Sequence, residues 1–175
     1  MSILSQTEHM NQLLNNMMVF SLASCKEIQK ERVDLSGIAN KISANLKLID
    51  PERSVEFNLM AGIEVSGDRC LLQDVLENLI GNAWKYTGKK ESATIEFGVK
   101  DHDGKQAYFV RDNGIGFGMN QSANLFGIFQ RLHCNDEFKG FGIGLATVKR
   151  IIQRHGGDVW AEGEVGKGAT IYFTL

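Results

Sequence analysis

The architecture of this chain follows from one stretch, Asn78-Leu-Ile-Gly-Asn82-Ala-Trp-Lys85-Tyr86. Apolar residues recur before and within it at spacings of three and four, which predicts a long helix that Asp68 caps and that ends near Tyr86. At these spacings Asn78, Asn82 and Lys85 project from one side of the helix, beside its apolar face. Two amides and a lysine in this arrangement suit magnesium and phosphate oxygens, although they also fit an ordinary solvated helix face.

Two glycine-rich segments follow this helix in the chain. Asp112-Asn-Gly-Ile-Gly116 ends an apolar strand, and Gly140-Phe-Gly-Ile-Gly144-Leu145 precedes a helix predicted over residues 142–155. A partly buried carboxylate at a strand end can accept a hydrogen bond from an adenine amino group, but Asp-Asn-Gly is also an ordinary turn. Free amides at the start of the later helix can face phosphates. The chain has no Gly-x4-Gly-Lys-Ser/Thr, which excludes a standard phosphate loop.

The remaining pattern predicts an α+β fold rather than a doubly wound parallel sheet, because strands and helices do not alternate strictly. A second helix begins at Asp34 or Ser36 and ends near Leu48, and residues 113–140 form a long loop with a helical turn inside it. The expected strands are Ser54–Met60, Ile63–Val65, Thr94–Val99, Gln106–Arg111, Asp158–Glu162 and Ala169–Leu175. Residues 1–32 are expected to form a helical arm and residues 33–175 a single domain.

Composition narrows the class of protein. The 175 residues are 43% hydrophobic and 23% charged with a net charge of -2, which is typical of a soluble globular domain and gives no reason to expect nucleic acid or direct membrane contact. Three widely spaced cysteines, Cys25, Cys70 and Cys134, match neither a disulfide framework nor a zinc site. A cytoplasmic location is therefore expected.

Taken in order, these motifs resemble the ATP-binding catalytic domain of sensor histidine kinases. The asparagine helix is followed by Asp112-x-Gly-x-Gly116, Phe126-x-x-Phe-x-Arg131, Gly140-x-Gly-x-Gly-Leu145 and Gly166-x-Gly-x-Thr170. The resemblance covers about residues 33–175 and is strongest to phytochrome-type and related multi-sensor kinases. It implies a two-layer α/β sandwich similar to the gyrase, Hsp90 and MutL ATPases, with ATP and Mg²⁺ bound beneath a lid.

The resemblance also implies roles for individual residues. Asn82 is the expected magnesium ligand, and Asp112 is the expected acceptor for the adenine amino group. Asn78, Lys85 and Arg131 are expected to act in phosphoryl transfer. The other residues expected to line the ATP site are Tyr86, Gly114, Gly116, Phe129, Gly140, Gly142, Gly144, Leu145 and Thr170. Phe141 departs from the family, which more often has a small or hydroxylated residue there.

Three functions are compatible with this pattern of motifs. In the related ATPases a glutamate four residues before the magnesium asparagine activates water, but here that position is Asn78, and Glu77 points about 100° round the helix. A histidine kinase is therefore favoured over an ATPase. A non-catalytic nucleotide-binding or anti-sigma-type domain is the second alternative.

The N-terminal arm favours the kinase and predicts its partners. Its apolar seam, which runs through Met10, Leu13, Met17 and Phe20, suits a helical bundle. The arm resembles the second helix of a dimerisation hairpin, which implies a homodimer and an acceptor histidine outside this chain. A response regulator receiver domain is the expected next partner.

Overall fold

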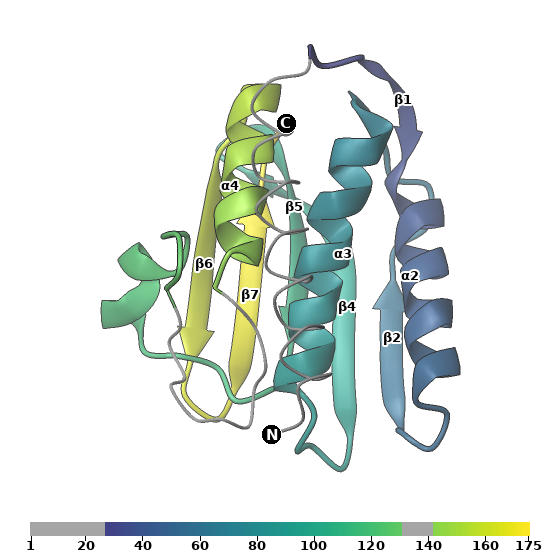
Figure 1. Cartoon of the computed structure of the whole chain (residues 1–175), viewed down its shortest axis with the longest axis vertical. Helices are drawn as coiled ribbons and strands as arrows, with labels where there is room; N and C mark the ends of the chain where they lie inside the picture. Colours follow the sequence, from purple (N-terminus) through teal and green to yellow (C-terminus); the bar gives the residue numbers. More distant parts are fainter. Residues whose placement is uncertain (1–26, 131–141) are drawn as a thin grey trace, which may run out of the picture.

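The computed structural model describes residues 27–130 and 142–175. In this part of the chain three helices cover one face of a five-stranded sheet (Figure 1). The helices are α2 (Leu35–Ile49), α3 (Arg69–Tyr86) and α4 (Gly144–His155). In sheet order the strands are β2 (Val55–Leu59), β4 (Ala93–His102), β5 (Lys105–Asp112), β7 (Gly168–Phe173) and β6 (Val159–Glu164). Only β2 and β4 are parallel among the neighbouring strands of this sheet, so the predicted two-layer α+β sandwich is confirmed.

The helices begin and end where their capping residues predict. Asp34 caps α2 by accepting a hydrogen bond from the Gly37 amide, and Asp68 caps α3 in the same way through the Leu71 amide. Helix α4 ends at Gly156, whose φ of 90° is the left-handed conformation that terminates many helices. Inside the loop predicted over residues 113–140, the helical turn is the 3₁₀ helix η1 (Met119–Asn124).

The β4–β5 hairpin is longer than the pattern predicted. The strands continue to His102 and restart at Lys105, which leaves only Asp103 and Gly104 in the turn. Both turn residues have positive φ, 53° and 78°, as the tightest right-twisted hairpins require. This hairpin brings the end of β5, with Asp112, back into the middle of the sheet.

A small second sheet lies at the predicted domain boundary. Residues 27–30 are not helical, and β1 (Glu31–Asp34) pairs with β3 (Glu64–Gly67) in an antiparallel arrangement. The predicted boundary between residues 32 and 33 falls within β1, whose Val33 is fully buried. The helix predicted for the arm otherwise falls on residues 1–26, which lie outside the described residues.

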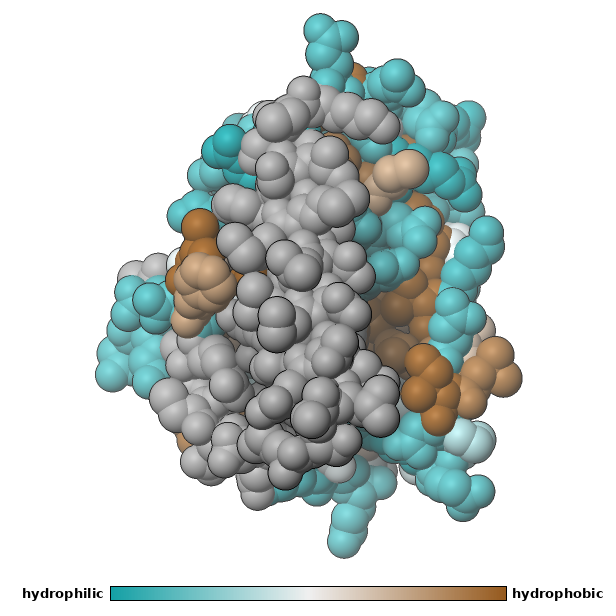
Figure 2. All heavy atoms as spheres, in the orientation of Figure 1, coloured by the Kyte–Doolittle hydropathy of each residue, from teal (hydrophilic) through white to brown (hydrophobic). Residues whose placement is uncertain are grey.

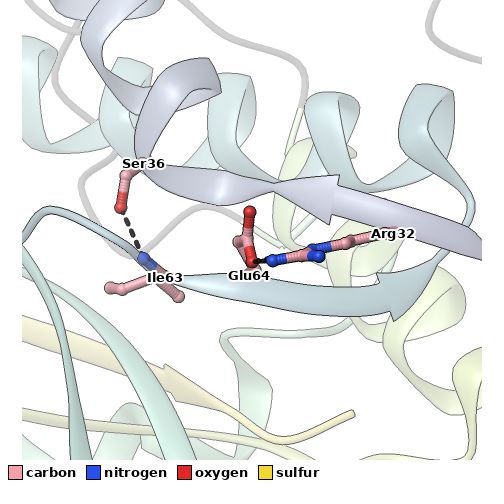
Figure 3. A network of polar contacts seen from close by, with 4 residues as sticks. All are labelled: Arg32, Ser36, Ile63 and Glu64. Atoms are coloured by element: carbon pink, nitrogen blue, oxygen red, sulfur yellow. Dashed lines mark hydrogen bonds and ion pairs between the residues drawn. The ribbon is translucent and has the colours of Figure 1, made fainter.

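Hydrogen bonds fasten this small sheet to the start of α2 (Figure 3). The Ser36 hydroxyl donates to the Met60 carbonyl at 2.6 Å and accepts from the Ile63 amide at 2.9 Å. Arg32 and Glu64 form an exposed ion pair across β1 and β3. The two strands thus hold the N-terminal ends of α2 and α3 together at one edge of the domain.

The main core lies between the three helices and the sheet. Helix α3 supplies its centre, with six side chains that are at most 2% exposed: Leu72, Val75, Leu76, Leu79, Ile80 and Ala83. His155, at the end of α4, is also buried and accepts a hydrogen bond at Nε2 from the Asp68 amide, 3.0 Å away. Its Nδ1 lies 2.9 Å from the Ile151 carbonyl, so this pattern requires a neutral ring that donates at Nδ1. The imidazole therefore joins α4 to the start of α3.

On the face that carries the helices, the coloured residues in Figure 2 are mainly hydrophilic, with apolar groups at the edges and between the hydrophilic residues. The exposed apolar residues of the described part include Leu48 and Ile49 in the last turn of α2, which are 79% and 78% exposed. Helix α2 thus buries one side and leaves its C-terminal end in water. Among the described residues, no helix combines the length and apolar character of a membrane span.

We expect Gly81→Ala to stabilise the protein. Gly81 lies in the interior of α3, and nothing among the described residues lies within 4 Å of a Cβ added there. Alanine restricts the unfolded chain, so the free energy of unfolding should rise by about 0.5–1 kcal/mol. Urea denaturation followed by circular dichroism measures this change. An unchanged or lower midpoint would mean that the side of α3 carrying Gly81 is not open.

Candidate functional site

The site is built around α3, and its first contact joins this helix to α4. Asn78 donates from Nδ2 to the Asp74 carbonyl at 2.8 Å, one turn earlier in the same helix. A Cβ added to Gly144, the first residue of α4, would lie 2.5 Å from the Asn78 Oδ1. The glycine therefore lets the start of α4 lie directly against the asparagine. The structure thus brings together two residues that are 66 positions apart in the sequence.

Asn82 and Lys85 lie on the same side of α3, one and two turns after Asn78. The Asn82 side chain is half-buried and makes no hydrogen bond with another described residue. The Lys85 ammonium lies 4.9 Å from the centre of the Tyr86 ring. A neutral oxygen donor and a lysine on one helix face are the groups that the sequence predicted for a metal and a phosphate.

Asp112 supplies the carboxylate of the site. It is the last residue of β5 and shares with Tyr108 and Val110 the side of the strand that faces the helices. Burial raises its pKa to about 6, although hydrogen bonds from the Gly114 and Ala169 amides act in the opposite direction. At neutral pH the group is therefore an ionised acceptor in a poorly solvated place.

The loop after β5 is held against the end of α3. The Gly114 amide donates to the Asp112 Oδ1 at 2.8 Å, and the Ile115 amide donates to the Tyr86 carbonyl at 3.2 Å. A Cβ added to Gly114 would lie 2.5 Å from that same carbonyl oxygen. Only glycine permits this approach. The loop therefore holds the Asp112 carboxylate close to the C-terminal end of α3.

Two further glycines seat this loop on the turn between β6 and β7. Gly116 has a φ of 62°, and a Cβ there would lie 1.9 Å from the Glu164 carbonyl oxygen. The Gly166 amide donates to the Ile115 carbonyl at 2.7 Å. Gly116 was expected to shape a base pocket, and the structure places it against the residues that flank the turn between β6 and β7, Glu164 and Gly168.

The residues just before α4 are hydrogen-bonded to the end of the preceding loop segment, at Phe129. The Phe129 amide donates to the Gly142 carbonyl at 2.9 Å, and both residues have positive φ, 61° and 69°. The Phe129 side chain is 58% exposed. Leu145 is partly buried against the core. Predictions for Arg131, Gly140 and Phe141 fall outside the described residues.

Thr170, which the sequence predicted to line the ATP site, lies in β7. It pairs with Arg111 across β5 and β7, and its Oγ1 accepts a hydrogen bond from the Arg111 Nε at 3.2 Å. Alternation along the strand puts this pair on the sheet face opposite the Asp112 carboxylate. The residue that pairs with Asp112 is Ala169, which the sequence analysis missed. Only the register between two distant strands identifies it.

The chain is similar to several known proteins. Residues 67–175 match the family described as histidine kinase-, DNA gyrase B-, and HSP90-like ATPase. The chain is 34% identical over 166 residues to the phytochrome-like protein Cph1 of Synechocystis sp., covering 95% of this chain and 22% of that protein. It is 33% identical over 178 residues to the sensor histidine kinase WalK of Bacillus subtilis, covering 98% and 29%. The chain thus spans less than a third of the length of either relative.

Solved structures give the same result for the fold. Full-length ShkA, solved in complex with AMPPNP, superposes with a TM-score of 0.79 at 26% identity, over 97% of this chain and 36% of that one. The mycobacterial sensor histidine kinase MprB superposes with a TM-score of 0.70 over 83% of this chain and 97% of that one, and at 21% identity it supports the fold alone. The chain therefore belongs to the histidine kinase-, DNA gyrase B- and HSP90-like ATPase family, as a catalytic domain of the sensor histidine kinase type.

Proposed function

We propose that this domain binds Mg-ATP and transfers its γ-phosphoryl group to a histidine of a dimerisation helix pair, in two-component signal transduction. Two observations carry the proposal: Asn78 contacts the start of α4, and a largely desolvated carboxylate at the end of β5 is connected through Gly114 to the C-terminal end of the same helix α3. Amide oxygens and lysine suit the metal and phosphates, while the carboxylate suits the adenine amino group.

The proposed roles follow from what each group offers. Asp112 accepts a hydrogen bond from the adenine amino group, while the Gly114 amide donates to one of its carboxylate oxygens. Asn82 fits a magnesium ion because its neutral oxygen is free of hydrogen bonds to the described residues. Lys85 acts as a point charge for a phosphate. When bound, magnesium supplies charge neutralisation on the phosphate oxygens. Arg131 is proposed for the terminal phosphate.

The site favours phosphoryl transfer to a protein over hydrolysis. Asn78, at the position of the water-activating glutamate in the ATPases, cannot act as a general base. The neighbouring Glu77 is exposed and accepts a hydrogen bond from the Gln73 Nε2 at 2.8 Å, one turn earlier on the outer surface of α3. Glu77 thus does not take the place of the missing base, and the domain is suited to positioning ATP for another nucleophile.

The partners of the domain are part of the same proposal. The acceptor imidazole comes from a helix pair, and a homodimer forms through the helical bundle to which the arm, predicted over residues 1–32, belongs. A response regulator receiver domain then takes the phosphoryl group from the histidine. These reactions take place in the cytoplasm, where ATP is available.

Asn82→Ala tests the metal assignment. We expect it to weaken ATP binding strongly with magnesium present and only slightly in EDTA, because the lost oxygen acts through the ion. The loss with magnesium should be roughly tenfold to a hundredfold, corresponding to about 1.5–3 kcal/mol for a contact with a charged group. Calorimetric titration in the two buffers measures both values. An equal loss in both would mean that Asn82 supports only the fold.

A phosphotransfer assay tests the reaction itself. Radiolabelled ATP is incubated with this chain and a separate dimerisation helix pair from a sensor histidine kinase. We expect acid-labile label on the helix pair at low efficiency, because transfer without a tether loses its high effective concentration. The control omits the helix pair and should give slow ATP turnover. Rapid hydrolysis that Glu77→Gln abolishes would instead support the ATPase reading.

A further inference from the structure

A column of stacked side chains fastens the C-terminal turn of α3 to β2 and α2. The Trp84 indole stacks on the Phe57 ring, with ring centres 6.0 Å apart and planes 11° from parallel. Cations cover the two outer faces: the Arg53 guanidinium lies 4.2 Å from the Trp84 ring, and the Lys47 ammonium lies 5.3 Å from the Phe57 ring. The column faces away from Asn82, since Trp84 lies about 200° round the helix from it, and Trp84 lies about 100° from Lys85.

Arg53 also donates a hydrogen bond to the end of α3, and its guanidinium is partly buried. Its Nη2 donates to the Thr87 Oγ1 at 2.8 Å, and that buried hydroxyl donates in turn to the Ala83 carbonyl at 2.7 Å. The Arg53 Nε is buried without a hydrogen-bond partner among the described residues. Burial also lowers the pKa of Arg53, against the opposing charge of Asp50. Burying a guanidinium with one unpaired donor costs free energy, so its contribution to global stability is reduced.

The C-terminal turn that Arg53 holds is connected to the carboxylate of the site. Thr87 is the C-cap of α3, directly after Tyr86. The Tyr86 carbonyl accepts from the Ile115 amide at 3.2 Å, and the adjoining Gly114 amide donates to the Asp112 Oδ1. Every step from Arg53 to the carboxylate is therefore a hydrogen bond or a peptide bond. A shift of this turn would move the loop and the carboxylate relative to each other.

We propose that Arg53 is a positioning residue for nucleotide binding, which acts through Thr87 and the end of α3 to fix the loop beside Asp112. The inference rests on the proposed function, because it assumes that this loop borders the adenine. Arg53 itself contacts no ligand. The planar guanidinium suits this role, since it stacks on an indole and donates sideways at the same time, which lysine does not.

Arg53→Met tests the proposal with two measurements made well below the melting temperature. Methionine keeps the stem and the packing but removes the planar cation. We expect Mg-ATP affinity to fall by about threefold to tenfold, the size of effect seen along coupled contacts. We also expect the Ile115 amide to exchange its hydrogen faster. Thr87→Val should reproduce both effects, whereas Thr87→Ser, which keeps the hydroxyl, should restore wild-type values.

The matched control is Lys100→Met, which removes a similar cation from the Tyr172 ring, 4.0 Å away, on the other sheet face. It should leave ATP affinity and Ile115 exchange unchanged. A fall in melting temperature for Arg53→Met and Thr87→Val with wild-type affinity and exchange would overturn the proposal, because Arg53 would then be merely structural. If Arg53→Met does not fold, Thr87→Val and Thr87→Ser decide the question. A wild-type chain that binds no ATP would instead contradict the proposed function, and the inference with it.

Discussion

Asp112→Asn should weaken ADP binding by roughly ten- to a hundredfold, because a charge-assisted hydrogen bond of about 1.5–3 kcal/mol is lost. The substitution keeps the shape of the side chain, but the new amide can present a donor to the adenine amino group. ADP is the better probe, since it lacks the terminal phosphate and reports mainly on the base. Calorimetric titration of both proteins measures the difference, and equal affinities would remove Asp112 from the base site.

The pH dependence of ADP binding should reflect the ionisation of Asp112. Since the pKa of Asp112 is about 6 in the folded protein, its ionised form increases between pH 5 and pH 7. ADP affinity should therefore rise over this interval with a midpoint near pH 6. Asp112→Asn should lose this component and retain only the titration of ADP itself. A pH profile that is the same in both proteins would mean that another group is responsible.

Asp112→Asn should make the free protein more stable, although it weakens ADP binding. A carboxyl group whose pKa is higher in the folded than in the unfolded chain costs stability once it ionises, so the cost is absent below about pH 4 and complete above about pH 6. Asparagine avoids it, and Asp112→Asn should raise the free energy of unfolding at pH 7.5 by on the order of 1–3 kcal/mol. Urea denaturation at pH 4 and pH 7.5 measures this. A variant that binds less tightly but is no more stable at pH 7.5 would contradict the burial of the charge.

Gly168→Ala should destabilise the protein by about 3–5 kcal/mol and lower its melting temperature by roughly 8–15 °C. Gly168 has a φ of 107°, and a Cβ there would lie 1.9 Å from the Asp112 carbonyl oxygen. Neither side can move easily, because both belong to the paired strands β5 and β7. Differential scanning calorimetry measures the shift, and nucleotide binding by the remaining folded protein should also weaken.

Gly62→Ala is the matched control for this change. Gly62 also has a positive φ, 76°, but nothing among the described residues lies within 4 Å of a Cβ added there. It should cost only the backbone strain, about 1–2 kcal/mol. The difference between the two variants isolates the collision at Asp112. If Gly168→Ala were no more harmful than Gly62→Ala, the close pairing of β7 with the end of β5 would be wrong.

Local chemistry made much of this molecule predictable. The helix over residues 69–86 follows from apolar spacing and from the Asp68 cap, both of which act within one or two turns. The turn at Gly104 and the end of α4 at Gly156 follow from backbone conformations that favour glycine. The strand β1 was missed because its pattern is short and its only support, the buried Val33, comes from pairing with β3.

The candidate site was also predictable from the sequence only in part. The sequence by itself determined that Asn78, Asn82 and Lys85 share one side of a helix, and that Asp112 ends a strand, because these relations depend only on helical and strand periodicity. It also determined the family, through the order of the motifs. Only the tertiary structure decided that Ala169 and not Thr170 lies opposite Asp112, that Gly144 contacts Asn78, and that Arg53 stacks on Trp84. Strand register and the packing of distant elements set these contacts, and a single residue of register moves every side chain to the opposite face of the sheet.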